Sequence, residues 1–505
     1  MTKLSPADTQ RVAPYVSNLD SNVFALAGLP EEVIAVLFAY YSRSPEDLRS
    51  NLAKLLQEDE HASSPTASNF RFATEKAKAF HEKWVVGYGH ASVAEHAVVH
   101  LAIENVSILA TKAIEDMRLG SYTEKSTRYV AFNDASFEPL PSLPEPLRAR
   151  YDEACRSLFR AYTALIPRVE EKIRAALPRG ENQGERAYDS SIRAKTFDLL
   201  RGLLPASTRT NLGVTTNARS LELLLSKLLA SPLPEVVTLA EAMHREALAV
   251  APTLVKYVTK NAYRVAMRET VAPLTALALP PAGHVTTAPR SGVDLLEYDG
   301  NGLERVLTAL AMEASEMTMS CEQLAGAVAG VSHDEKLELF RASLTERGPF
   351  DAVPRAFEAA HVSFELVLDY GAWRDMQRHR LVSPFVQRLG CDLGYVVPQE
   401  LVDFGLADEF SAAIEAVIPV WRAIVDECPW QAQYVVPLAC RMRTAWYMNL
   451  REWYHVVELR SSKAGHASYR YIAQEMYRTL VIAWPWLDGT ARVDQKTYPF
   501  GRVDA

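Results

Sequence analysis

Two arginines flank a histidine at Arg378-His379-Arg380, and side chains of these types are suited to binding an anion. Guanidinium groups bind phosphates and the edges of planar heterocycles because their N–H donors form a rigid fork. An amphipathic run at 364–373 precedes the triplet and Pro384 follows it, so we expect a helix that ends near Ser383. A basic helix end is also typical of ordinary solvated surface. On these residues alone both readings stay open.

A second segment alternates small or hydroxylated residues with charged ones, from Gly120 to Arg128. Serine hydroxyls and an arginine in a tight loop can cradle a phosphate, although most loops of this kind are surface turns. Residues 129–132, Tyr-Val-Ala-Phe, are typical of a strand and are expected to end the segment.

A third segment begins with a glycine-rich turn and predicts a helix that runs from Ser92 to about Met117. Ser92 is a suitable N-cap, and Glu95 three residues later completes a capping box. Three candidate metal ligands follow at intervals of four residues: His96, His100 and Glu104. The outer two would lie about 12 Å apart along a helix, which is too far for one ion. We therefore predict no metal site.

Composition limits the class of protein. A chain of 505 residues with 48% hydrophobic and 23% charged residues predicts a globular protein of two or more domains. The net charge of −8 argues against a general nucleic-acid or membrane binder and favours a small anionic ligand. Five cysteines without metal-site spacing, and no apolar signal or spanning segment, indicate the cytoplasm.

Hydrophobic periodicity and the positions of proline, glycine and capping residues predict the helices and strands around these segments. We expect helices over residues 24–41, over 145–177 and after Asn217, and a short strand followed by a helix over 295–315. Residues 276–292 contain Pro280-Pro281 and a glycine, and are the best candidate for a linker.

The chain also repeats itself. Arg380-Leu381-Val382-Ser383 echoes Arg118-Leu119-Gly120-Ser121 at an offset of 262 residues. Pro437 lies 12 residues before Asn449, as Pro205 lies 12 before Asn217, at an offset of 232. A tandem duplication accounts for both offsets if the first copy holds about 30 extra residues between its anchors. We predict an N-terminal repeat over 1–275, the linker, and a C-terminal repeat over 293–505.

These residues resemble the flavin-dependent thymidylate synthases, whose motif can be written R-H-R-x-x-S-x-x-E-x-S-x-R-Y. Neither copy is complete. The first has Asp116-Met117-Arg118 in place of the triplet but keeps Ser121, Glu124, Ser126, Arg128 and Tyr129. The second keeps the triplet but has Val386, Arg388 and Gly390 after Ser383. The first keeps Arg201 where the second has Gln433, and the second keeps Arg460 where the first has Leu228. What one copy has lost, the other tends to keep.

The resemblance implies an α/β (α+β) fold of two tandem domains, each a β-sheet packed with long helices, that together form a pseudo-dimer. It implies reductive methylation of deoxyuridylate (dUMP) to thymidylate (dTMP), with FAD as cofactor and NADPH and methylenetetrahydrofolate as co-substrates. A family tetramer would correspond to a homodimer of duplicated chains. Each active site would be a hybrid that contains residues of both repeats, and the remaining residues at the equivalent positions would form sites without activity.

Site residues follow from the same resemblance. Arg460 would be catalytic. The cofactor-binding residues would be His90, Ser92, Glu95, Arg378, His379, Arg380, Leu381, Asn449, Arg451 and His455. The substrate-binding residues would be Glu124, Lys125, Ser126, Thr127, Arg128, Arg201, Gln377, Arg378 and Arg460. On one helix, Asn449 and Arg460 would fall within about 20° of each other, while Arg451 and His455 would point elsewhere. Two alternatives remain: a flavin or nucleotide enzyme with altered chemistry, and a non-catalytic nucleotide-binding scaffold.

Overall fold

The computed structural model describes residues 4–20, 24–40, 47–57, 91–181, 183–278, 292–315, 318–498 and 500. The chain divides into two compact units. The first comprises Met1–Val106, Ala110–Glu124 and Thr210–Pro281. The second comprises Ser107–Leu109, Lys125–Arg209 and Ala282–Ala505, so a large part of the first half of the sequence packs with the second half.

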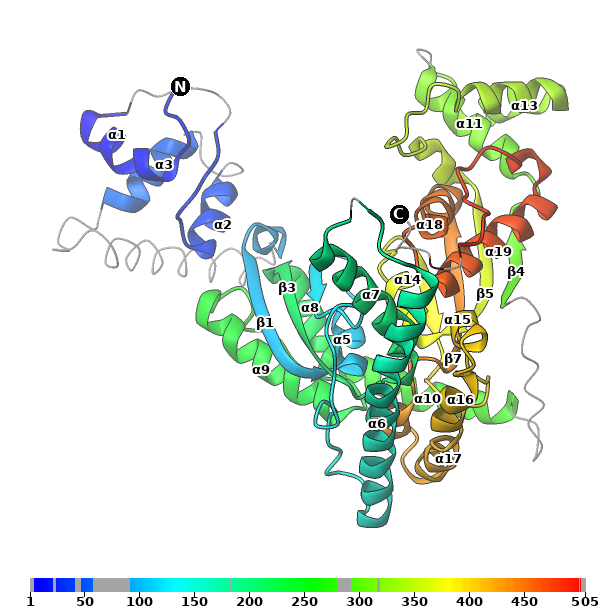
Figure 1. The fold of residues 1–505 in the computed structure, drawn as a ribbon. Helices are drawn as coiled ribbons and strands as arrows, with labels where there is room; N and C mark the ends of the chain where they lie inside the picture. Colours follow the sequence, from blue (N-terminus) through cyan, green and yellow to red (C-terminus); the bar gives the residue numbers. More distant parts are fainter. Residues whose placement is uncertain are drawn as a thin grey trace. The chain divides into compact units, whose positions relative to one another are not determined.

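The first unit combines helices with a three-stranded sheet of order β1-β3-β2, of which β1 and β3 are labelled in Figure 1. Its N-terminal helices pack around buried residues such as Val33, Leu37 and Leu52. Its elements are α1 (Pro6–Val12), η1 (Ala13–Tyr15), α2 (Glu31–Tyr40), α3 (Leu48–Gln57), η3 (Ala91–Glu95), β1 (Val98–Ser107), α5 (Ile108–Ile114), β2 (Ser121–Glu124), β3 (Arg209–Asn217), α8 (Ala218–Leu228), α9 (Pro234–Val250) and α10 (Ala262–Ala278).

The second unit is built on an antiparallel sheet of order β4-β5-β7-β6. Its strands are β4 (Val293–Tyr298), β5 (His361–Asp369), β6 (Ser383–Val386) and β7 (Arg441–Asn449). Helices α18 (Leu450–Ser461) and α19 (Ala467–Ala483) pack on each other, and α19 also lies against β4 and β5 (Figure 1).

The long helix α6 (Glu145–Ala176) packs against α7 (Glu185–Leu200) and against two helices from much later in the sequence, α16 (Ala407–Glu415) and α17 (Ile418–Glu427). The remaining elements are η4 (Arg201–Leu203), α11 (Gly302–Ala314), α12 (Cys321–Ala329), α13 (His333–Ala342), η5 (Arg355–Ala359), α14 (Tyr370–Met376), α15 (Gln399–Asp403), η6 (Gln431–Val435) and η7 (Pro485–Leu487). Within the described residues, no helix combines the length and apolar character that crossing a membrane requires.

The mixed helix-and-sheet class and several predicted elements are confirmed. Helix α6 covers the predicted 145–177, α8 begins after Asn217, and β4 followed by α11 forms the predicted strand and helix. The helix predicted over 24–41 begins only at Glu31, after Pro30. Most of the predicted linker, residues 279–291, lies outside the described residues.

The helix predicted from Ser92 to Met117 is wrong. This stretch forms η3, the ten-residue strand β1 and the short helix α5. Ser92 and Glu95 lie inside η3, and His100 and Glu104 lie on a strand. Pairing of β1 with β3, more than a hundred residues away, outweighs the local helical pattern. The helical spacing used to test a metal site there therefore does not apply.

Two further predictions are corrected. Residues 364–369 belong to β5, and the helix before the Arg-His-Arg triplet is α14, which ends at Met376 rather than near Ser383. Apolar residues in β5 alternate with mostly polar ones, which is the pattern of a strand, and the pairing with β4 and β7 extends it to Asp369. The strand predicted at 129–132 is instead β2, at Ser121–Glu124, which pairs with β3.

The tandem duplication predicted from the sequence recurs in the elements. The offset of 262 relates α5 to α14 and β2 to β6, and the offset of 232 relates β3 to β7. Backbone hydrogen bonds repeat with the same offsets. Ile108 N–H donates to the Thr208 carbonyl (2.9 Å), as Tyr370 N–H donates to that of Cys440 (3.0 Å).

The two copies also meet at equivalent segments inside the second unit. Pro205 and Pro437, the anchors of the second offset, form an antiparallel bridge. Hydrogen bonds on either side are reciprocal under the offset of 232: Ala206 N to Val436 O (2.8 Å) matches Leu438 N to Leu204 O (2.8 Å), and Ser207 N to Tyr434 O (2.9 Å) matches Ala439 N to Gly202 O (2.9 Å).

Candidate functional site

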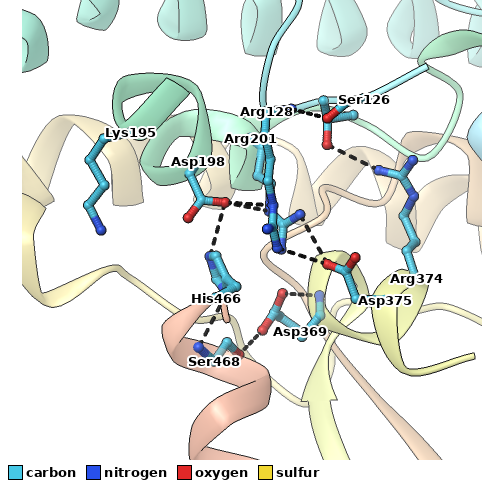
Figure 2. Close-up of polar contacts among 12 residues, drawn as sticks. Ser126, Arg128, Lys195, Asp198, Arg201, Asp369, Arg374, Asp375, His466 and Ser468 are labelled. Atoms are coloured by element: carbon cyan, nitrogen blue, oxygen red, sulfur yellow. Dashed lines mark hydrogen bonds and ion pairs between the residues drawn. The ribbon is translucent and has the colours of Figure 1, made fainter. Parts of the chain in front are cut away.

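A buried cluster of charged side chains lies in the second unit, where residues from both halves of the sequence meet. Arg128 is at its centre: Nε lies 3.0 Å from Asp198 Oδ1, and Nη2 donates to Asp375 Oδ2 at 3.0 Å. Arg201 approaches the same two carboxylates, at 3.8 Å from Asp198 and 3.5 Å from Asp375. Figure 2 shows the two arginines lying between the two aspartates.

Local structure explains how these groups meet. Asp198 lies near the end of α7, and Arg201, three residues later, begins η4, so the two side chains are neighbours on successive turns. Asp375 lies in the last turn of α14. Its neighbour Arg374 is buried and donates from Nη1 to Thr127 Oγ1 at 3.4 Å. Ser126 Oγ accepts from the Arg128 N–H at 3.2 Å, which shapes the turn around that arginine.

His466 extends the cluster toward α19. It is the N-cap of that helix, and its Nδ1 accepts from the Ser468 N–H at 3.2 Å. Its Nε2 lies 3.9 Å from Asp198 Oδ1. The Ser468 hydroxyl donates to Asp369, the N-cap of α14, so the starts of the two helices are tied together (Figure 2).

Burial and neighbouring charge set the ionisation of the cluster. Burial alone would raise the pKa of Asp198, but His466 and the surrounding cations, Arg128 among them, lower it to about 2. The pKa of Asp375 is likewise lowered by Arg128 and Arg201 against the effect of burial. Burial lowers the pKa of His466 to about 4. At neutral pH the cluster therefore contains ionised carboxylates, paired arginines and a neutral imidazole.

Two of the cavities that adjoin the cluster share Lys195 and Asp198. The larger, of about 400 Å³, is walled mainly by apolar residues such as Val367, Val396 and Ile472. The smaller, of about 180 Å³, is lined by three cationic side chains and four hydroxyls: Arg128, Lys195, Arg470, Tyr129, Ser190, Ser191 and Tyr498. An anionic group with hydrogen-bond acceptors suits the smaller cavity.

A second polar group contains the histidine of the triplet. His379 Nδ1 lies 3.1 Å from Glu452 Oε1, and Arg460 Nε donates to His379 Nε2 at 2.8 Å. Burial lowers the pKa of His379 to about 4, while the hydrogen bond from His379 helps to lower that of Glu452 to about 2 despite burial. His455 stacks edge-on against His379, with the ring centroids 4.9 Å apart.

Tyr469 connects the two groups. The guanidinium of Arg128 lies 5.8 Å from the centroid of its ring, and that of Arg460 lies 5.5 Å from it. Both distances fall within the range of cation–π attraction. The predicted substrate arginine of the first copy and the predicted catalytic arginine of the second copy therefore contact one aromatic ring.

The buried histidines predict how stability depends on pH. His379 and His466 bind protons near pH 6.5 when unfolded but only near pH 4 when folded, so the unfolded state gains protons first as pH falls. The free energy of unfolding should therefore fall from about pH 6.5 toward pH 4, by about 1.4 kcal/mol per pH unit for each histidine. Urea denaturation at several pH values measures this slope.

His379→Gln should flatten the slope, because it removes one of the two buried groups. His333→Gln is the matched control, since His333 is exposed, and it should leave the slope unchanged. A stability that increases on acidification through this range would contradict the assignment.

Several predicted residues lie elsewhere or have other partners. His90 lies outside the described residues. In the first unit, Glu95 pairs with Arg219, Ser92 is exposed, and Glu124 is buried between Thr111 and Lys112. In the second unit, Lys125 lies over the ring of Phe132, and Arg451 binds Glu358 and the Val353 carbonyl.

The remaining predicted residues surround α14 and α18. Arg378, Arg380 and Leu381 are exposed beyond the end of α14, and Gln377 caps that helix through its backbone. Asn449 is the N-cap of α18, where its side chain accepts from the Glu452 N–H at 2.9 Å. The structure thus groups Thr127, Arg128 and Arg201, and separately His379, His455 and Arg460.

Sequence reasoning missed the acidic members of both groups. Asp198, Asp375 and Glu452 match no position of the motif as it was written. A signal was present for each: Asp198 precedes Arg201 by three residues on a helix, Asp375 precedes the triplet by three, and Glu452 lies midway between Asn449 and His455.

Comparison with known proteins agrees with the duplication. The family model for thymidylate synthase complementing protein matches residues 36–253 and again 294–486. A UPF0159 protein of Chlamydia muridarum is 34% identical over 499 residues, covering 95% of this chain and 93% of the relative. A UPF0159 protein of Thermoplasma acidophilum is 31% identical over 477 residues, 85% of this chain and 91% of that one.

More distant relatives have a stated activity. The flavin-dependent thymidylate synthase of Pyrococcus abyssi is 26% identical over 190 residues, 38% of this chain and 68% of its own length. The two family-model matches together extend over most of the sequence and coincide with the two structural copies. The chain therefore belongs to the thymidylate synthase complementing protein family.

Proposed function

We propose that this protein is an FAD-dependent thymidylate synthase that methylates dUMP reductively, with methylenetetrahydrofolate and NADPH as co-substrates. The observation that supports it is that Arg128, a motif residue kept by the first repeat, and Arg460, an arginine kept only by the second repeat, contact the same aromatic ring in one unit. Thr127 and Arg128 of the first repeat contact Arg374 and Asp375 of the second, and Arg460 shares Tyr469 with Arg128.

A pseudo-dimer of the two repeats is part of this proposal. The reciprocal backbone hydrogen bonds around Pro205 and Pro437 have the pattern of an isologous contact, in which equivalent residues exchange roles across a two-fold axis. Two such chains would then assemble as a homodimer equivalent to four single-repeat subunits.

The phosphate of dUMP would occupy the smaller cavity. Arg128, Lys195 and Arg470 supply positive charge there, and serine and tyrosine hydroxyls supply donors. The base would lie toward Arg460. Arg460 and the cavity-lining Arg128 both contact the ring of Tyr469, so Arg460 is close to the wall of this cavity. A guanidinium at a uracil carbonyl oxygen stabilises the negative charge that develops there when C5 reacts.

The residues after α14 fit a flavin in their chemistry. Arg378 and Arg380 are exposed cations on either side of buried His379, and Leu381 beside them is 58% exposed, so charge and apolar surface are adjacent. FAD, an anionic molecule with a flat ring system, matches that combination. When bound it would supply the hydride that no amino acid can provide. Arg378, His379 and Arg380 would hold it, and the two arginines would favour its anionic reduced form.

Formation of dTMP by the purified full-length chain tests the proposal. With FAD, NADPH, methylenetetrahydrofolate and dUMP the protein should produce dTMP, and omission of FAD should stop it. Arg378→Ala should weaken FAD binding about tenfold to a hundredfold, because it removes a charge-assisted contact. Arg388→Ala is the matched control: Arg388 is also exposed, but it lies over Trp430, and its replacement should leave FAD affinity unchanged.

A second candidate function, flavin chemistry on an altered substrate, is favoured by one observation. Arg128 and Arg201 are already paired with Asp198 and Asp375, so a phosphate dianion entering beside them meets two carboxylates. The same assay with deoxyuridine in place of dUMP separates the two. Turnover of the nucleoside but not of the nucleotide would replace the first proposal by the second.

A further inference from the structure

We propose that Glu452 is a positioning residue that orients Arg460 through His379. The inference deepens the proposed function, on which it rests for the catalytic role of Arg460. The three side chains form a chain of two hydrogen bonds, 3.1 Å from His379 Nδ1 to Glu452 Oε1 and 2.8 Å from Arg460 Nε to His379 Nε2.

The identity of the partners fixes where the proton lies. An arginine N–H can only donate, so His379 Nε2 must be the unprotonated acceptor. The proton of a neutral imidazole then resides on Nδ1, where it faces the Glu452 carboxylate. Glu452 thus stabilises the tautomer of His379 whose Nε2 can accept the hydrogen bond from Arg460. With the opposite tautomer, two N–H groups would face each other and Arg460 would be displaced.

Burial and neighbouring side chains hold these three side chains in place. The side chains of His379 and Glu452 are 1% and 4% exposed, so neither exchanges its partner for bulk water. Glu452 lies in the first turn of α18 and Arg460 in the last, and His379 bridges them from the segment after α14. The Arg460 guanidinium lies over the ring of Tyr469, 5.5 Å from its centroid, and its Nε donates to His379. The two contacts together restrict the orientation in which the group meets a substrate.

The first repeat lacks all three members together. By the two offsets, Ser220 corresponds to Glu452, Met117 to His379 and Leu228 to Arg460. If Glu452 served only to cap or pack α18, it would have no reason to be absent with the other two. Asn217 and Asn449, which do cap the two equivalent helices, are present in both repeats.

A metal site is the rival reading of the same residues. His379, Glu452 and His455 offer ligand atoms within 4.8 Å of one another. Coordination through His379 Nδ1 would move its proton to Nε2, where Arg460 already donates. The hydrogen bond from Arg460 therefore favours the chain of hydrogen bonds over an ion.

Two variants of the full-length protein test the proposal. Glu452→Gln keeps an oxygen acceptor for Nδ1–H, whereas Glu452→Leu removes it. In protein labelled with ¹⁵N-histidine, the His379 signals, assigned by their loss in His379→Gln, should show the Nδ1–H tautomer in the parent and in Glu452→Gln but not in Glu452→Leu. Glu452→Leu should lower kcat about 100-fold with little change in the KM for dUMP, because Arg460 is misplaced. Glu452→Gln should restore most of that activity.

Glu458→Leu is the matched control. Glu458 is a partly buried carboxylate on the same helix, but it binds Arg347 through two contacts of 2.7 Å, away from His379. Its replacement should leave the His379 tautomer and kcat unchanged.

An Nε2–H tautomer in the parent protein would overturn the proposal. So would one equivalent of bound zinc that is lost in Glu452→Leu and His455→Ala. The NMR measurement of the His379 tautomer does not depend on enzymatic turnover. A chain with the Nδ1–H tautomer and no dTMP formation would therefore refute the proposed function while leaving the hydrogen-bond chain established.

Discussion

Replacement of Arg128 by leucine should lower the free energy of unfolding of the second unit by about 3–5 kcal/mol, because it leaves buried charges unpaired. Arg128 binds Asp198 and Asp375 at 3.0 Å each, and both carboxylates are ionised at neutral pH. Arg201 would remain, but at 3.5 and 3.8 Å it is a weaker partner. Binding of dUMP should be lost as well, since the smaller cavity loses a cation.

Urea denaturation followed by tryptophan fluorescence measures this effect. Every tryptophan other than Trp84 belongs to the second unit, so the signal reports chiefly on that unit. Arg168→Leu is the control, because Arg168 pairs with Glu409 at the surface, where ion pairs contribute little. Its midpoint should match that of the parent. Equal effects of the two replacements would show that Arg128 is not the centre of the cluster.

A double variant separates stability from binding. Arg128→Leu combined with Asp198→Asn removes one buried cation together with one buried carboxylate and leaves Arg201 paired with Asp375, and so should recover much of the lost stability. It should not recover dUMP binding, because the positive charge is still missing. If stability and dUMP binding returned together, Arg128 would have no direct role toward the nucleotide.

The duplication was predictable from the sequence because it depends on spacing, which folding does not change. The anchors at 118 and 380 fall in equivalent connections between a helix and a strand, Asn217 and Asn449 end equivalent strands, and each asparagine caps the helix that follows it. Capping depends on residues three apart in the chain, so local chemistry is enough to place it. Helix α6, with its long amphipathic pattern, was predictable for the same reason.

Strand β1 was not predictable, because its partner lies far away in the sequence and the pairing with β3 decides the outcome. Strand β5 did carry a local signal, since apolar residues alternate with mostly polar ones along it, but the sequence analysis missed that alternation. The acidic residues of the site were missed for a reason related to that for β1. Asp198 gains its role from Arg128, seventy residues earlier, and only the folded chain brings the two together.

Replacement of Arg460 by alanine should lower the rate of dTMP formation about 10²- to 10³-fold, the usual cost of removing one group that stabilises developing charge. The guanidinium is half-buried, stacks on Tyr469 and receives its orientation from His379. Single-turnover measurement with prereduced enzyme isolates the chemical step from flavin reduction. Arg478→Ala is the control: Arg478 lies on α19, pairs with Glu475 at the surface, and should be dispensable.

Arg460→Lys distinguishes charge from geometry. Lysine keeps the positive charge but has no Nε–H fixed in the plane of a fork, so it cannot donate to His379 and present two further donors at once. We therefore expect most of the loss seen with alanine to remain. Full activity of the lysine variant would mean that positive charge alone suffices near the uracil, and the oriented chain from Glu452 through His379 would then have no catalytic consequence. A lysine variant as inactive as the alanine variant would show that the reaction requires the orientation of the guanidinium plane and not only its charge.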